Sequence, residues 1–199
     1  YLKLDQLLGA QQPLSGLHDE MLFIVIHQTK ELWLKQMLHE VSLAIRLVEE
    51  DRFAPAYKAL SRVSRIQEVM TLSWDVLSTL TPVDYLAFRD VLGTSSGFQS
   101  AQFRELEFRF GIKDERFLKH YPADSVAHAR LRAALDYQLA EKLLDIDDAL
   151  AGWRHKHVLT VERIIGNKRG TGGSAGAPYL RSTLDKRAFP ELWALRTDL

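Results

Sequence analysis

Apolar side chains recur every three or four residues along most of the chain, the spacing that gathers them on one face of a helix. Glycine and proline, which interrupt helices, are sparse outside one segment near residue 170. The pattern predicts a first helix over residues 18–51, about 45 Å long. A second helix is predicted from near Pro55 to about residue 80. We therefore expect an all-α fold, a helical bundle built on long scaffold helices.

Local signals predict the shorter elements. Thr81 followed by Pro82 is typical of an N-cap with proline at the first helical position, and it predicts a short helix over residues 85–91. A loop of small residues is expected over 93–97. Further helices are predicted over 99–110 and 126–165, the latter with a break allowed, and a turn at Pro122 separates them.

The length and composition narrow the class of protein. A chain of 199 residues favours one domain, residues 1–199. Its 26 Lys and Arg balance 26 Asp and Glu, so no bulk attraction to nucleic acid or to an anionic membrane is expected. The longest apolar run, residues 21–26, is far shorter than the roughly 20 residues that span a bilayer, and a cytoplasmic location is expected. Cysteine is absent, so any metal must be held by His, Asp or Glu.

Two pairs of side chains share a helical face at a spacing of four residues. Phe23 and His27 lie among apolar neighbours, where a histidine can be a satisfied core residue or the single polar group of an apolar pocket. Tyr85 and Arg89 repeat the spacing on the third helix. An arginine binds a carboxylate through two parallel hydrogen bonds, although Arg89 also suits an ion-paired surface position.

His155 and His157 flank Lys156 on the last long helix. Their side chains point roughly 200° apart, so they cannot bind one metal together and only one can face inward. His157 lies on the more apolar stripe, with Trp153 one turn before it. It is the better candidate for an inward imidazole that holds a haem iron.

The segment GTGGSAG at residues 170–176 contains four glycines directly after a long helix. It is either a flexible helix terminus with glycine at the C-cap or a loop that closes on a ligand. A phosphate-binding loop is disfavoured, because these glycines follow a helix and no Gly-Lys-Ser or Gly-Lys-Thr ends the motif.

Taken together, these segments resemble a known family. HDEMLFIVIHQTKELW (residues 18–33) closely resembles the distal-pocket helix of bacterial tryptophan 2,3-dioxygenases, and YLAFR (85–89) with SSGFQS (95–100) resembles their substrate-carboxylate segment. WRHKH (153–157), VER (161–163) and GTGG (170–173) resemble their haem-ligand helix and substrate loop. The resemblance covers nearly the whole chain, from YLKLD at residues 1–5 to FPELW at residues 189–193.

The resemblance implies a site with haem b as cofactor. His157 would be the proximal iron ligand, and His27 would accept a hydrogen bond from the substrate indole N–H on the distal side. Trp74 would lie near the haem edge. The remaining positions implied to contact substrate are Phe23, Tyr85, Arg89, which clamps its carboxylate, Thr171, which binds its ammonium and carboxylate, and Gly97, where the backbone approaches haem and substrate.

The implied reaction uses O₂ to cleave the indole C2–C3 bond of L-tryptophan, giving N-formylkynurenine in the first step of tryptophan catabolism. The resemblance also implies a homotetramer in which Tyr1 and Leu2 enter a neighbouring subunit's pocket. Two alternatives stay open: a sibling haem monooxygenase acting on a substituted tryptophan or another indole, and a haem-binding helical protein without turnover.

The chain departs from the family pattern at two places. Family members usually have a further helical segment where Leu135 and Asp136 are adjacent here, so either helices have been lost or the printed chain lacks part of the natural protein. We expect the second explanation, because both flanks follow the family pattern up to a sharp junction. His155 stands where an aromatic residue is usual, which bears on haem access.

Overall fold

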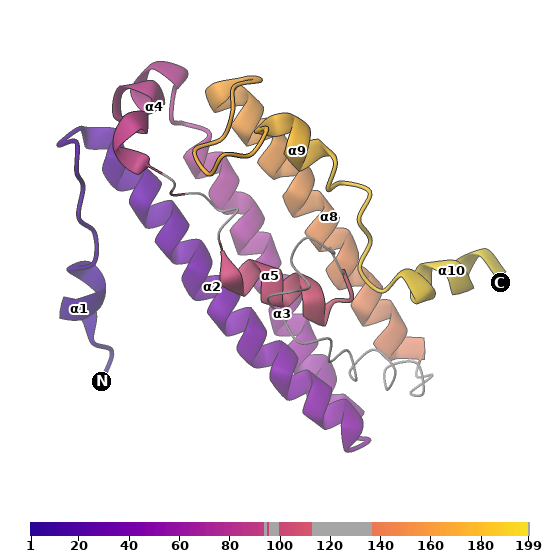
Figure 1. Ribbon diagram of the computed structural model, residues 1–199. Coiled ribbons are helices and arrows are strands. Elements are labelled where there is room, and N and C mark those ends of the chain that lie inside the picture. The colour runs from indigo at the N-terminus through magenta and orange to yellow at the C-terminus, as the bar shows by residue number, and fades with distance from the viewer. Residues whose placement is uncertain (94, 96–99, 113–136, 199) are drawn as a thin grey trace.

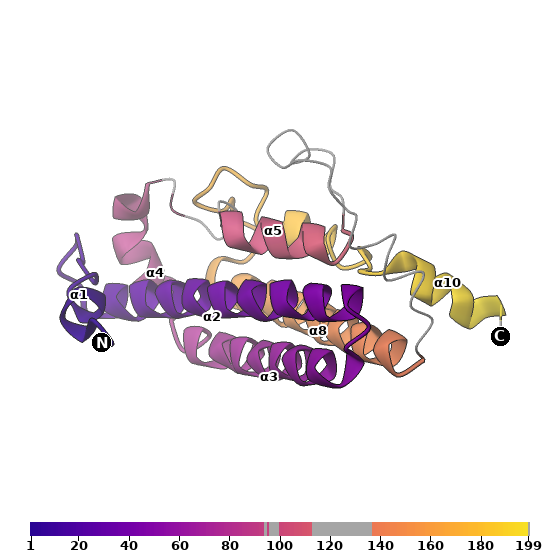
Figure 2. The ribbon, with the colours of Figure 1, turned by 90° about the horizontal axis from the view of Figure 1, so that it is seen from below.

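The computed structural model describes residues 1–93, 95, 100–112 and 137–198, and every regular element in these ranges is a helix (Figure 1). Three long helices form the body: α2 (His18–Glu49), α3 (Phe53–Leu77) and α8 (Tyr137–Ile165). Helix α3 packs against both α2 and α8, and α5 (Ala101–Arg109) lies across α2 on the other side (Figure 2). The predicted all-α class is confirmed.

The core lies between the three long helices, where their apolar stripes meet. Met37 of α2, Val63 of α3 and Ile146 of α8 are 1%, 0% and 0% exposed, respectively. Burying such side chains contributes about 1.5 to 3 kcal/mol each, so these stripes hold the long helices together. None of the described helices is both long enough and apolar enough to cross a membrane.

The start of α2 is fixed by a carboxylate in its first turn. Glu20 is 2% exposed and accepts hydrogen bonds from the backbone N–H groups of Leu14 and Ser15 at 2.8 and 2.7 Å. The Ser15 hydroxyl donates to the same carboxylate. These bonds lower the pKa of Glu20 and hold the preceding loop against the helix end.

The N-cap predicted at Thr81 is present at the start of the helix that follows α3. Helix α4 (Pro82–Phe88) starts with Thr81 as N-cap, and the Thr81 hydroxyl accepts a bond from the Asp84 N–H. The predicted helix over 85–91 therefore starts earlier, at Pro82, and tightens into a 3-10 turn, η1 (Arg89–Leu92). Helix α5 is capped in the same way by Ser100, which accepts from Phe103 N–H at 3.0 Å.

Three short helices were not predicted: α1 (Leu4–Leu8), α9 (Ala177–Arg181) and α10 (Pro190–Asp198). The first two have five residues, which is too few to show a helical period. The first long helix also ends at Glu49 rather than near residue 51, because Asp51 adopts a φ of 56°. Pro122 and the beginning of the helix predicted over 126–165 lie outside the described residues.

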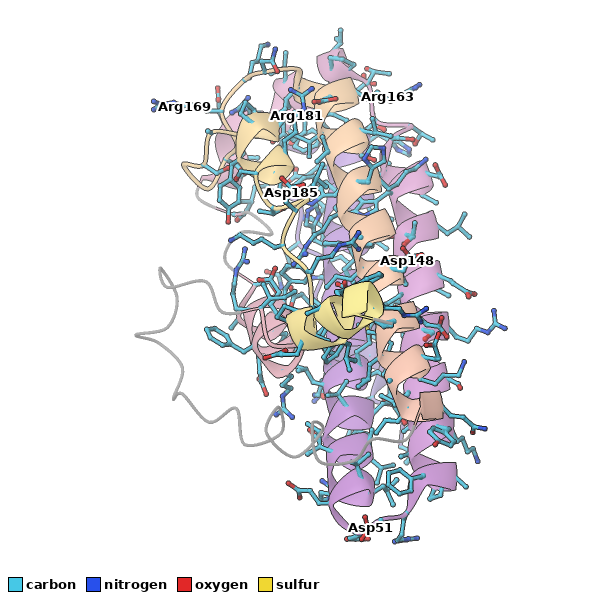
Figure 3. The ribbon with its side chains drawn as sticks, turned by 90° about the vertical axis from the view of Figure 1, so that its right-hand side faces the viewer. Asp51, Asp148, Arg163, Arg169, Arg181 and Asp185 are labelled. Atoms are coloured by element: carbon cyan, nitrogen blue, oxygen red, sulfur yellow. The ribbon has the colours of Figure 1, made fainter. Side chains whose placement is uncertain are left out.

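The two ends of the bundle differ in character. Figure 3 shows Asp51 at one end, where α2 turns into α3, and Arg163 and Arg169 at the opposite end. Arg169 belongs to the segment that leads into the glycine-rich residues 170–176. The glycine-rich segment thus lies over the same end of the bundle as the first turns of α2 and as α4 (Figure 1).

Candidate functional site

A cavity of about 860 Å³ lies between α2, α3, α5 and α8, and the glycine-rich segment borders it. Its wall is mainly apolar, with aromatic side chains from α2, α3, α5 and α8: Phe23, Trp74, Phe103 and Trp153. The volume is at the upper end of the roughly 300 to 1,000 Å³ that ligand pockets span. The space therefore suits a large, mainly apolar ligand.

His157 lines this cavity, whereas His155 is exposed, as the apolar stripe predicts. The imidazole of His157 stacks on Trp74 with ring centroids 4.2 Å apart and an interplanar angle of 10°. Burial lowers the pKa of His157 to about 3. The ring keeps some accessible surface because it faces the cavity, and its neutral form is the form that binds a metal.

His27 lies on α2 in the wall of the same cavity, one turn after Phe23, whose ring centroid is 4.1 Å away. Its Nδ1 is 2.7 Å from the carbonyl oxygen of Phe23. A carbonyl oxygen can only accept, so Nδ1 carries the proton and donates it. Burial lowers the pKa of His27 to about 4, so the ring is neutral near pH 7 and Nε2 is left as a hydrogen-bond acceptor.

Aromatic side chains from α4 extend the wall beside Phe23. Tyr85 and Phe88 are 6% and 1% exposed, and each ring lies 6.0 Å from that of Phe23 between centroids. Burial raises the pKa of Tyr85, although the charge of Arg89 and a hydrogen bond with Thr171 oppose the rise. Tyr85 therefore connects the aromatic wall to both of the polar side chains predicted to bind a carboxylate.

Arg89 and Thr171, more than 80 positions apart in the sequence, both lie beside Tyr85 at the rim of the cavity. Arg89 is half-buried and donates a hydrogen bond to the carbonyl oxygen of Arg169. Thr171 lines the cavity, and its hydroxyl donates to the carbonyl oxygen of Ser95 at 2.6 Å. Two bonds therefore tie this part of the chain to the region after α4: Arg89 bonds to Arg169, just before the glycine-rich segment, and Thr171 of the segment bonds to Ser95.

The conformation of the glycine-rich segment depends on Gly176, which has a φ of 74°. A Cβ at this position would lie 2.3 Å from the carbonyl oxygen of Lys168. Only glycine accommodates both this φ and this close approach. Gly176 therefore lets the segment close into a compact turn that borders the cavity, and closure of the segment on a ligand stays a prediction.

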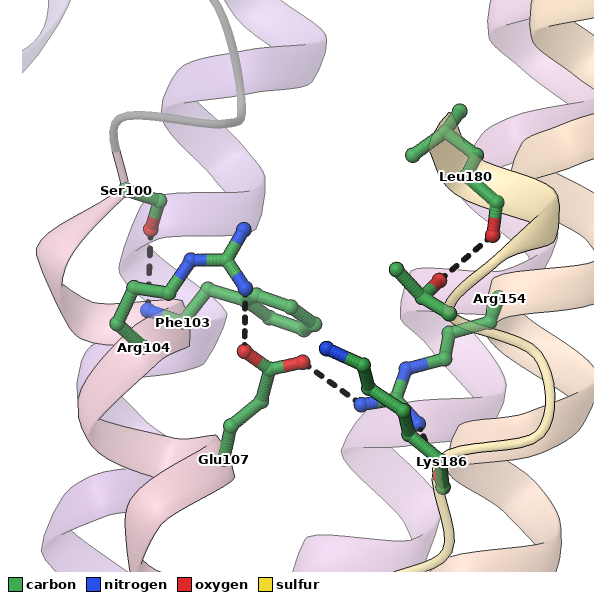
Figure 4. A network of polar contacts seen from close by, with 8 residues as sticks. Ser100, Phe103, Arg104, Glu107, Arg154, Leu180 and Lys186 are labelled. Carbon is green, nitrogen blue, oxygen red and sulfur yellow. Dashed lines mark hydrogen bonds and ion pairs between the residues drawn. The ribbon is translucent and has the colours of Figure 1, made fainter. Parts of the chain in front are cut away.

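A network of charged side chains borders the cavity between α5 and α8. Figure 4 shows Glu107 between Arg104 and Arg154, with a distance of 2.7 Å from Glu107 Oε1 to Arg154 Nη2. Arg154 also donates to the carbonyl oxygen of Lys186 at 2.6 Å. Glu107 and Arg154 are 6% and 4% exposed. These residues were not predicted to belong to the site. The available signal was the presence of charged residues within apolar helical stripes of the sequence.

Lys30 is a further residue of the cavity wall that was not predicted. It lies one turn beyond His27 on α2, is 6% exposed, and its Nζ is 2.7 Å from the centroid of the Trp74 ring. Burial lowers the pKa of Lys30 to about 6. Its position in the apolar stripe with Ile26 and Leu34 was the available signal, since a lysine at such a position is unusual.

Some residues predicted for the site are not placed there by the single chain. Gly97 lies outside the described residues. Tyr1 and Leu2 are 114% and 66% exposed and do not line the cavity. The structure thus brings together Phe23, His27, Trp74, Tyr85, His157 and Thr171 around one space, with Arg89 at its rim.

Comparison with known proteins finds one family along the whole chain. A family model described as tryptophan 2,3-dioxygenase matches residues 1–129 and 127–199. A tryptophan 2,3-dioxygenase of Caulobacter vibrioides is 54% identical, with 100% of this chain and 97% of the relative covered. Those of Bacillus cereus and Bordetella pertussis are 45% and 43% identical, with all of this chain and 91% and 89% of the relatives covered.

These alignments also show a difference in length. Each runs over 254 positions, which exceeds the 199 residues of this chain by 55. The two matches to the family model meet at residues 127–129, within the stretch 113–136 that the structure does not describe. The junction predicted at Leu135 and Asp136 lies outside the described residues too. The relatives therefore contain a segment that this chain lacks.

Proposed function

The chain belongs to the tryptophan 2,3-dioxygenase family, and on this basis we propose that its cavity binds haem and L-tryptophan and cleaves the indole C2–C3 bond with O₂. The product is N-formylkynurenine. The observation that carries the proposal is the identity of 54% across the full chain, joined to one cavity that is lined by six of the expected side chains: Phe23, His27, Trp74, Tyr85, His157 and Thr171. The motif resemblance to this family is confirmed.

The residues around the cavity fit haem. His157 offers one neutral imidazole from a rigid helix beside an apolar space, and no cysteine competes as an axial ligand. The indole N–H groups of Trp74 and Trp153 are buried without partners among the described residues, so the cavity wall still has hydrogen-bonding capacity. When bound, haem supplies the iron that activates oxygen, and the protein supplies orientation and a dry environment.

His27 acts as the acceptor for the indole N–H of the substrate. The hydrogen bond from Nδ1 to the Phe23 carbonyl leaves Nε2 unprotonated and turned away from the helix backbone. Because burial keeps the ring neutral, His27 orients the indole without presenting a positive charge to it. Phe23 and Tyr85 pack beside the indole and exclude water.

Arg89 and Thr171 bind the polar end of the amino acid. The guanidinium of Arg89 binds the carboxylate through two hydrogen bonds, and the Thr171 hydroxyl contacts the ammonium and carboxylate groups. Arg89 donates to the carbonyl of Arg169, the residue that precedes the glycine-rich segment, so the substrate carboxylate replaces this backbone acceptor. This exchange removes one of the bonds that hold the chain before the glycine-rich segment, so substrate binding is coupled to the position of that segment.

The N-terminal segment suits association with further copies of the chain in a homotetramer. Helix α1 stands apart from the bundle in Figure 1, and its apolar side chains are uncovered: Leu4, Leu7 and Leu8 are 49%, 40% and 70% exposed. Exposed apolar side chains of this size stabilise an assembly when a partner subunit covers them. In the proposed assembly, Tyr1 and Leu2 enter the pocket of a neighbouring subunit.

The proposal is tested by a single turnover with product analysis. The protein is reduced without oxygen, mixed with L-tryptophan and then with O₂, and the product mass is measured. A product that contains both oxygen atoms supports cleavage by a dioxygenase. Insertion of one oxygen atom would identify a monooxygenase instead, and an unchanged spectrum and substrate would indicate a haem-binding protein without turnover.

A further inference from the structure

Lys30 is buried in the cavity wall, and the part of the chain that the structure describes offers it no anion to pair with. Its side chain is 6% exposed, and its Nζ has no hydrogen-bond partner among the residues that the structure describes. The Lys30 Nζ lies over the face of Trp74, the same indole that stacks on His157. A lysine in such a position is disfavoured unless something compensates for the loss of water.

The carboxylates that border this part of the cavity are already engaged. Glu31 accepts a hydrogen bond from the Gln102 side chain at 2.7 Å. Glu107 is bound between Arg104 and Arg154, so one carboxylate faces two guanidinium groups. Among the described residues, the cavity wall around α5 and α8 therefore carries more positive than negative charge, and Lys30 adds to this excess when it is protonated.

Lys30 is separated from the proposed substrate-carboxylate site. Along α2, Phe23 precedes His27 by one turn and contacts Tyr85, which connects to Arg89. Lys30 follows His27 and contacts Trp74. The two cationic side chains thus lie on opposite sides of His27, so a carboxylate at Lys30 belongs to a different group from the one at Arg89.

We propose that Lys30 binds a carboxylate of the cofactor, as the ionic partner of a haem propionate. This inference rests on the proposed haem function. The burial of Lys30, its lack of a partner and its contact with the Trp74 that stacks on the iron-ligand candidate are the observations that carry it. A bound carboxylate also restores the charged form that burial disfavours.

Haem release tests the proposal without depending on activity. The full chain is loaded with haem and mixed with excess apomyoglobin, which captures the haem that dissociates. Lys30→Met keeps the length and apolar character of the side chain but removes its charge. We expect haem loss about 10- to 100-fold faster from Lys30→Met, partial recovery in Lys30→Arg, and no change in Lys58→Met, an exposed lysine on α3.

The dimethyl ester of haem separates charge pairing from packing. In the wild-type protein, the ester should be lost faster than haem by at least the factor seen for Lys30→Met, and the substitution should then have little further effect. Equal release of haem and ester from the wild type would overturn the proposal even if a Lys30 variant did not fold. Normal haem retention by Lys30→Met would overturn it while leaving the proposed function intact. Failure of the wild type to take up haem would overturn both.

Discussion

His157 and His155 differ only in the helical face that they occupy. The first lines the cavity against Trp74 and the second is exposed. We expect His157→Ala to abolish stable haem incorporation, because no cysteine replaces the lost imidazole. His155→Ala is the matched control and should retain haem. The ratio of the Soret to the protein absorbance after purification measures both, and the reverse ranking would refute the assignment of His157.

Substitution of Arg89 tests whether this side chain makes the protein select an amino acid over an indole that lacks a carboxylate. Loss of a charge partner in a desolvated site costs about 3 to 5 kcal/mol. We expect Arg89→Leu to lower kcat/KM for L-tryptophan by orders of magnitude and to leave the binding of indoles without a carboxylate almost unchanged. Arg65→Leu, which removes an exposed arginine paired with Glu68, should change neither. An equal loss for both ligands would assign Arg89 a structural role.

His27 makes the stability of the protein depend on pH. Its pKa is about 4 in the folded chain against the ordinary value of 6.5, so the unfolded state binds a proton first as the pH falls. The free energy of unfolding should therefore drop between pH 6.5 and 4.5, and His27→Gln should remove about 2 to 3 kcal/mol of that drop. Urea unfolding at several pH values measures the difference. Parallel curves for the two proteins would contradict burial of the imidazole.

At the scale of elements, one carboxylate joins α5 to α8. Glu107 bridges Arg104 of its own helix and Arg154 of α8, and all three side chains are 12% exposed or less. We expect Glu107→Gln to lower the free energy of unfolding by about 3 to 5 kcal/mol, because two buried guanidinium groups lose their shared counter-charge. Chemical denaturation followed by circular dichroism measures this loss.

Glu105→Gln is the matched control on the same helix. Glu105 pairs with Arg109 and its side chain is 40% exposed, so its removal should cost about 1 kcal/mol or less. A similar cost for both variants would show that the buried network is not what holds α5 against α8. Haem retention by the same variants would show whether the network also shapes the cavity.

At the scale of the whole molecule, the comparison with relatives predicts a natural chain longer than 199 residues. The alignments to relatives contain 55 positions beyond the 199 residues here, and the family match divides at residues 127–129. We expect the protein isolated from its natural source to have an intact mass well above 22.8 kDa, because a segment present in the relatives is missing from the printed sequence. A mass of 22.8 kDa would identify a shortened member of the family.

The sequence by itself determined the features that depend on neighbours a few residues apart. The start of α2, the Thr81 cap of α4 and the inward side of His157 all follow from helical spacing and local hydrogen bonds. These interactions form within one or two turns, so the pattern of residue types is sufficient to predict them. Where no such signal exists, as in α1 and α9, the prediction failed.

The tertiary structure decided which charged groups are buried and which of them meet. Glu107 and Arg154 are 47 positions apart, and Arg89 bonds to a carbonyl 80 positions away. Lys30 is buried only because α3 and its Trp74 close over that face of α2. Desolvation and ion pairing depend on groups that folding brings together. Desolvation by these groups also lowers the pKa values of His27 and His157. Periodicity along one helix contains no information about them.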